Sequence, residues 1–172
     1  MIDCMDSPQP DQNYVYHGSH EIFDVVAPKK QVRIRDGKEI FNEISFHATP
    51  YKWIALAYTC IQKPISRNGK KTNYMMGVSL YNHALKVDIF GIESLERSLE
   101  EMYGQGGYLY VFDKKDFYHT EGLGNLEVIT KDPIKPIRVD KIDNPIEEMK
   151  KERVKFNFID LTLAKNAEYW FK

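Results

Sequence analysis

Two polar residues interrupt apolar stretches of the chain in places where a side chain can reach a ligand. In the stretch YVYHGS, a run of β-forming residues ends on His17, Gly18 and Ser19, and in LEVIT the acid Glu127 stands between apolar neighbours. An imidazole can hydrogen-bond a ligand, and glycine lets a ligand lie against the main chain. A carboxylate facing a cleft can stabilise positive charge that develops in a transition state. A strand-ending histidine, a turn glycine and a solvent-facing glutamate are the structural alternatives that the sequence leaves open.

A third stretch, SFHATPYKWIALAY, contributes aromatic rings. Phe46 and Tyr58 are the two side chains in it that can stack on a flat heterocycle. The alternative for both is a place in the hydrophobic core, which is the commoner role of an aromatic residue in an apolar pattern.

Other kinds of chemistry find little support. The five histidines have no spacing typical of a zinc site, and the glycine-rich stretches GQGG and GLGN lack the strand and helix that a phosphate-binding loop needs. Neither Cys4 nor Cys60 has a neighbouring histidine, and no G-x-S-x-G motif occurs. The sequence therefore predicts no metal site and no recognisable nucleophile.

The elements that must position these residues are mostly strands. YVYHGS predicts a strand over 14–19, and Asp36-Gly37 predicts a hairpin turn between QVRIR and EIFNEISF. Thr49 is the expected N-cap of a helix whose first residue is Pro50. One face of that helix carries the apolar residues Trp53, Ile54, Ala57, Tyr58 and Ile61.

Further strands are expected at 74–81, 84–90, 107–113, 126–130 and 135–142. A helix is expected from Ile92 to a stop at Gly104, and another begins after Asn144; the last stretch, 156–172, is compatible with a strand or a helix. Strands that follow one another along the chain favour an α+β fold with antiparallel pairing. We expect a flexible tail over 1–13 and one domain over 14–172.

Composition narrows the class of protein. The chain has 172 residues, of which 42% are hydrophobic and 28% charged, and a net charge of −1, so it has no electrostatic signature for nucleic acid or an anionic membrane. Its apolar runs are too short to cross a bilayer. Two cysteines without disulfide or metal spacing, and no signal-peptide pattern, favour a cytoplasmic location.

In chain order, YHGS, SFHATPYKWIALAY and LEVITKDPIKPIRV resemble motifs of the ADP-ribosyltransferase superfamily, in the His-Tyr-Glu branch that includes diphtheria toxin and the poly(ADP-ribose) polymerases. In that branch a first strand ends in His-Gly-Ser or His-Gly-Thr. A later aromatic strand leads into a helix, and a final strand carries the catalytic glutamate. The resemblance lies in three short stretches spread over residues 14–140.

The resemblance implies two packed, mainly antiparallel sheets with flanking helices, and NAD as a substrate whose ADP-ribose is transferred while nicotinamide is released. It implies catalytic roles for Glu127 and His17. It further implies NAD contacts from His17, Gly18, Ser19, Phe46 and Tyr58.

The chain departs from the family at three positions, one of which is Leu126, directly before Glu127, where some enzymes carry a polar residue. Phe46 stands where the family has a tyrosine, and Arg35 lies near the expected place of a second stacking tyrosine. A non-enzymatic binding module on the same or another α+β scaffold therefore stays open. An NAD-consuming transferase that processes RNA phosphates is a third alternative. It would need a cluster of arginines and histidines to bind phosphate, whereas the positive charges of this chain look dispersed along the sequence. The acceptor of ADP-ribose is not indicated by the sequence.

Overall fold

The computed structural model of the chain describes residues 8–81 and 84–171. The strands are β1 (Tyr14–Ser19), β2 (Lys29–Arg35), β3 (Lys38–Ala48), β4 (Pro64–Arg67), β5 (Lys70–Asn73), β6 (Met75–Tyr81), β7 (Ala84–Gly91), β8 (Gly107–Asp113), β9 (Val128–Thr130), β10 (Arg138–Ile142) and β11 (Lys155–Asp160). The helices are α1 (Lys52–Ala57), α2 (Leu95–Tyr103), α3 (Pro145–Lys151) and α4 (Ala164–Trp170), with a short 3-10 turn at Lys114–Asp116.

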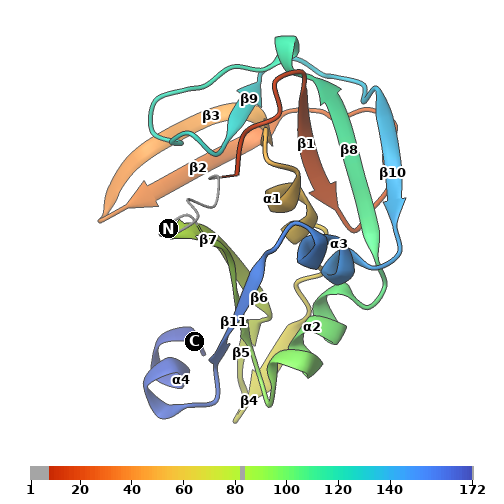
Figure 1. Cartoon of the computed structure of the whole chain (residues 1–172). Helices are drawn as coiled ribbons and strands as arrows, with labels where there is room; N and C mark the ends of the chain where they lie inside the picture. Colours follow the sequence, from red (N-terminus) through yellow and green to blue (C-terminus); the bar gives the residue numbers. More distant parts are fainter. Residues whose placement is uncertain (1–7, 82–83, 172) are drawn as a thin grey trace, which may run out of the picture.

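Two three-stranded sheets form the upper half of the molecule in Figure 1. One has the order β1-β8-β10 and the other β2-β3-β9, and all of their pairings are antiparallel. The end of β3 also meets β1 through a bridge between Tyr16 and Thr49. The core between the sheets is apolar and includes Val15, Phe112 and Val128. This bridge makes the two sheets neighbours at the place where β1 carries His17.

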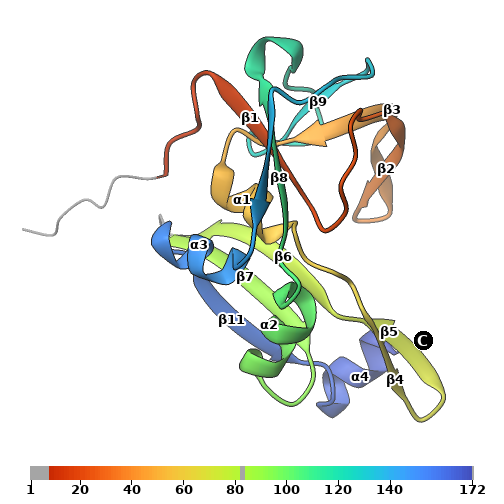
Figure 2. The same cartoon turned by 90° about the vertical axis from the view of Figure 1, so that its right-hand side faces the viewer.

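The lower half contains a third sheet of order β11-β7-β6, in which β11 runs parallel to β7. The hairpin β4–β5 lies beside it, α1 and α3 lie between this sheet and the upper half, and α2 packs against β7 (Figures 1 and 2). A second core packs helix residues such as Leu56 and Met102 against Val87 and Ile89 of β7. The helices therefore share their apolar faces with the lower sheet.

The expected α+β class is confirmed: strands in several antiparallel sheets dominate, with few helices. The sheet arrangement is more divided than expected, because the strands form three separate three-stranded sheets and β11 pairs in parallel. The stretch 156–172, compatible with a strand or a helix, contains both: most of β11, followed by α4.

Local turn chemistry accounts for the confirmed hairpins. Asp36 and Gly37 both have positive φ, at 51° and 73°, between β2 and β3. Turns with two positive φ angles match the twist of paired strands and favour Asp-Gly and Asn-Gly. Asn68 and Gly69 repeat this conformation between β4 and β5.

The predicted start of the first helix is wrong. Thr49 is not its N-cap, because its main chain bridges to Tyr16 and its hydroxyl accepts a hydrogen bond from the N–H of Tyr51. The helix begins at Lys52 and ends at Ala57, so Ile61 lies beyond it. Thr49 thus serves sheet pairing instead of helix capping.

Part of the segment expected to be a loose tail is tied to the domain. The main-chain N–H of Asp11 donates to the carbonyl of Pro50, and its carboxylate accepts from the Tyr16 hydroxyl at 2.6 Å. Residues 1–7 lie outside the described part of the chain.

Gly18 allows α1 to approach β1 closely. A Cβ at this position would lie 1.7 Å from the carbonyl oxygen of Ala55 and 3.0 Å from the amide nitrogen of Thr59. Both are main-chain atoms that cannot rotate away. The glycine that the sequence predicted for ligand contact is therefore also required by the packing of α1.

We expect Gly18→Ala to lower the free energy of unfolding by more than about 2 kcal/mol, because overpacking here must displace backbone. Urea unfolding measures this. The matched control is Gly77→Ala, since nothing lies within 4 Å of a Cβ at Gly77. Equal stability of the two variants would contradict the close packing of α1 on β1.

Candidate functional site

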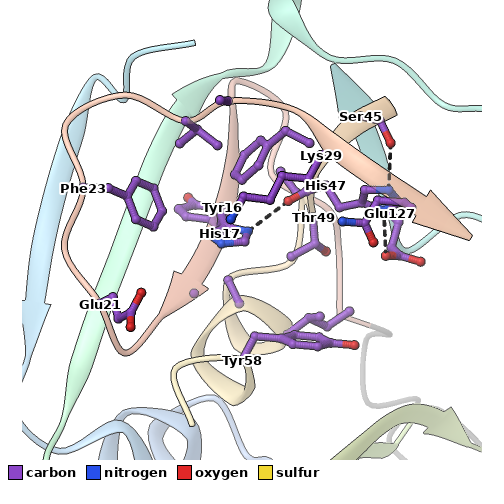
Figure 3. A pocket seen from close by; sticks show the side chains of 18 of the residues that line it. Tyr16, His17, Glu21, Phe23, Lys29, Ser45, His47, Thr49, Tyr58 and Glu127 are labelled. Carbon is purple, nitrogen blue, oxygen red and sulfur yellow. Dashed lines mark hydrogen bonds and ion pairs between the residues drawn. The ribbon is translucent and has the colours of Figure 1, made fainter. Parts of the chain in front are cut away.

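A cavity of about 550 Å³ opens between the two upper sheets and α1 (Figure 3). Its walls come from β1, the 20–28 connection, β2, the end of β3, α1 and the residue just before β9. Five of the residues predicted from the sequence line it: His17, Gly18, Phe46, Tyr58 and Glu127. Segments far apart in the sequence therefore converge on one cavity.

Ser19, the sixth predicted residue, does not line this cavity. Its hydroxyl accepts a hydrogen bond from the N–H of Glu21 at 3.0 Å. This contact within the 20–28 connection is the turn-forming role that serine commonly has.

His17 is held by the main chain of β3. Its Nδ1 lies 2.9 Å from the carbonyl oxygen of His47, and because a carbonyl only accepts, Nδ1 carries the proton. Burial lowers the pKa of His17 to about 4, although this hydrogen bond opposes the shift. The ring is therefore neutral at pH 7, and Nε2 carries the lone pair that can accept a hydrogen bond.

Glu127 is placed by the pairing of β3 with β9. His47 lies opposite Ile129, so Glu127, two residues earlier, is the diagonal neighbour of His47 on the same face. Its Oε1 lies 3.3 Å from His47 Nδ1 and 3.4 Å from the Arg33 guanidinium. The side chain is 31% exposed, so it is neither sealed in the core nor fully solvated.

The charge on Glu127 is decided by its neighbours. Burial acts to raise the pKa of this carboxyl, but the His47 hydrogen bond and the positive charge of Arg33 outweigh it, and the pKa is lowered. Glu127 is thus a carboxylate at neutral pH, facing a partly enclosed cavity.

Ser45, His47 and Glu127 form a hydrogen-bonded chain (Figure 3). The Ser45 hydroxyl lies 3.0 Å from Nε2 of His47, whose Nδ1 faces Glu127. The connectivity equals that of a serine hydrolase triad. Ser45 is only 1% exposed, however, so a substrate carbonyl cannot reach its oxygen. The hydroxyl instead holds the orientation of the His47 ring.

Phe46 and Phe23 present aromatic surface to the cavity. Phe46 is buried and packs against the His17 ring, with centroids 4.6 Å apart. Phe23, from the 20–28 connection, lies parallel to the Tyr110 ring at 4.1 Å, and the Tyr110 hydroxyl accepts from its N–H. Phe23 was not predicted as a site residue, because nothing in the sequence indicates how its loop folds back.

Alternate residues of β2 add positive charge. Lys29, Gln31 and Arg33 line the cavity, as the two-residue period of a strand requires. Arg35, the arginine singled out in the sequence, does not line it, since the pairing register shifts between Arg33 and Ile34. The sequence KKQVRIR does contain polar residues at i, i+2 and i+4, and this pattern could have predicted that Lys29, Gln31 and Arg33 share one face of the strand.

Tyr58 lies at the end of α1 and is 50% exposed. The alternative of a core tyrosine is therefore wrong. It lines the same cavity as Glu127, below the His17–His47 pair in the view of Figure 3.

Other chemistry is sparse in the described ranges. Residues 8–81 and 84–171 contain no group of three or more His, Cys, Asp or Glu side chains that could hold a metal ion. Burial raises the pKa of the Cys60 thiol to about 11, which makes it a poor nucleophile. In the same ranges, each helix is too short or too polar to span a membrane. His83 and Cys4, considered as ligands or nucleophiles from the sequence, lie outside the described residues.

Comparisons with protein-family models, with curated proteins and with solved structures give no match.

The neutral state of His17 predicts a pH-dependent contribution to stability. Because its folded-state pKa lies below 6.5, the unfolded chain takes up a proton here first as the pH falls. The contribution is complete above about pH 6.5 and is lost toward about pH 4. We expect the difference in unfolding free energy between wild type and His17→Gln to shrink by roughly 2 kcal/mol between about pH 7.5 and about pH 4.5.

Urea unfolding at both pH values measures that difference. His119→Gln, which removes an exposed histidine outside the cavity, is the control. A difference between wild type and His17→Gln that stays constant with pH would contradict a buried, neutral His17.

Proposed function

We propose that the chain is an NAD-dependent ADP-ribosyltransferase that transfers ADP-ribose to an acceptor nucleophile and releases nicotinamide. One observation carries the proposal: His17 of β1 and Glu127 before β9 line the same open cavity, together with Phe46 and Tyr58. These residues are the ones that the resemblance to the His-Tyr-Glu branch singled out.

The protonation states suit a ribose. The lone pair on His17 Nε2 can accept a hydrogen bond from one ribose hydroxyl, and the Glu127 carboxylate can accept from another. Aromatic surface from Phe23 and Tyr58 is available to the flat nicotinamide ring. The cavity thus offers acceptors for the sugar and rings for the base.

The reaction that this arrangement favours is cleavage of the N-glycosidic bond. The bond between ribose C1′ and the pyridinium nitrogen breaks, and its electron pair leaves with nicotinamide, which becomes neutral. Positive charge develops on the ribose, where a nearby carboxylate stabilises it. The acceptor then forms a bond to C1′ and gives up its proton.

Lys29 and Arg33 suit the diphosphate. Both line the cavity from the same face of β2, and both are exposed enough to meet a charged group. Cationic side chains bind phosphate oxygens through charge-assisted hydrogen bonds. Two of the positive charges that looked dispersed in the sequence thus lie on the same face of one strand.

The alternative of a non-enzymatic binding module gains less support. A module that only holds a partner needs no carboxylate kept ionised in a partly buried place. The contacts of Glu127 with His47 and Arg33 maintain that charge at the cavity wall. The geometry therefore favours the enzyme over the binding module.

We expect NAD to raise the melting temperature of the wild type and to be converted with release of nicotinamide. Glu127→Gln should fold normally but lower the rate of release at least about 100-fold, because it removes the charge that stabilises the transition state. Chromatography of nicotinamide and a thermal melt measure the two effects. Glu121→Gln, an exposed carboxylate outside the cavity, is the matched control. Full turnover by Glu127→Gln would exclude the proposed role.

A second prediction concerns the diphosphate. We expect Lys29→Gln to weaken NAD binding roughly fivefold and to leave binding of free nicotinamide unchanged, because one charge contact worth about 1 kcal/mol is lost. Calorimetric titration with each ligand measures this. Lys30→Gln is the control, since Lys30 is the next residue on β2 and does not line the cavity. Equal losses for both ligands, or in both variants, would argue against a diphosphate contact.

A further inference from the structure

We infer that His47 is a positioning residue that holds the Glu127 carboxylate by Oε1 and so leaves Oε2 for a ligand in the cavity. This inference deepens the proposed function and rests on it. His47 belongs to none of the residues that the sequence resemblance singled out.

His47 contacts both candidate catalytic residues. Its carbonyl oxygen accepts the Nδ1–H of His17 at 2.9 Å, and its own Nδ1 lies 3.3 Å from Glu127 Oε1. The side chain is only 13% exposed, so the ring is fixed by its surroundings. One residue of β3 therefore sets the position of an imidazole through its main chain and of a carboxylate through its side chain.

The orientation of the His47 ring is over-determined. Nε2 lies 3.0 Å from the Ser45 hydroxyl, and Nδ1 carries the proton that points to Glu127, because a carboxylate only accepts. The Phe41 ring meets the His47 ring edge-on, with centroids 5.4 Å apart at 84°. These two contacts fix the plane of the ring, with Nδ1 facing the carboxylate.

Both polar contacts of Glu127 in the described part of the chain fall on the same oxygen. Arg33 of β2 and His47 of β3 approach Oε1, at 3.4 Å and 3.3 Å. Two other titratable groups lie near this pair: Tyr58, directly after α1, which senses the Glu127 charge, and His17 of β1, which senses His47. Neither forms a hydrogen bond with the Glu127 carboxylate. Oε2 is thus the oxygen left to accept a hydroxyl.

The experiment compares three variants by NMR titration of 13C-labelled glutamate carboxyl groups, with Glu127 assigned from the signal missing in Glu127→Gln. In His47→Leu the hydrogen bond is lost while burial remains, so the Glu127 midpoint should move to higher pH. In His47→Asn the amide nitrogen occupies the place of Nδ1 and can donate, so the midpoint should return toward the wild-type value. His119→Leu, at an exposed histidine outside the cavity, should leave it unchanged.

Turnover gives the second readout. We expect His47→Leu to lower kcat for nicotinamide release about tenfold with KM for NAD within about twofold, as loss of one hydrogen bond to a charged group predicts. The acid limb of the pH dependence of kcat should shift to higher pH in His47→Leu, together with the Glu127 midpoint. His47→Asn should recover most of kcat.

An unchanged Glu127 midpoint in folded His47→Leu would overturn the inference. If that variant does not fold, His47→Phe decides, because it keeps an aromatic ring at this place but has no N–H to donate to Glu127. A midpoint shifted upward supports the inference and an unchanged one overturns it. The titration needs no NAD, so a wild type that releases no nicotinamide would refute the proposed function and leave the role of His47 to be decided by the titration.

Discussion

The candidate site depends on the end of β3 pairing on both sides at once. On one side Ala48 and His47 face Val128 and Ile129 of β9, and on the other Thr49 bridges to Tyr16 of β1. His17 and Glu127 each lie one residue beyond these pairs. Their common cavity therefore follows from strand register, since a slip of one residue in either pairing would turn a side chain to the opposite face.

Burial disfavours the charged form of both His17 and Glu127, but the two groups end in different protonation states because their neighbours differ. A low-dielectric environment favours the neutral form of both groups. For His17 burial prevails, because its hydrogen bond to a carbonyl needs only the Nδ1 proton that the neutral ring already has. For Glu127 a donor and a cation prevail over burial. The site thereby pairs a neutral acceptor with an ionised one.

The parts of the fold that local chemistry determines could be predicted from the sequence. Asp36-Gly37 gives its hairpin because few residues accept two positive φ angles, and Gly104 ends its helix as expected. Thr49 shows the limit: its type and position favour a helix cap, but a main-chain bridge to β1 takes precedence. The same holds for Gly18: a Cβ is excluded there by the main chain of Ala55, which belongs to another element, so the sequence around Gly18 does not reveal the constraint.

The parts of the site that could not be predicted depend on register between distant strands. His47 looks like an ordinary strand residue until β9 brings a carboxylate to its diagonal position. Arg33 and Arg35 are equivalent in a two-residue pattern, and only the irregular register after Arg33 separates them.

The pairing of these strands also determines how the charged side chains of the cavity are held. Arg33 and His47 lie on two paired strands of one sheet and Glu127 directly precedes the third strand, so their mutual geometry follows from main-chain pairing. Such a frame suits the reaction that we propose, in which both acceptors must be in place before charge develops on the ribose.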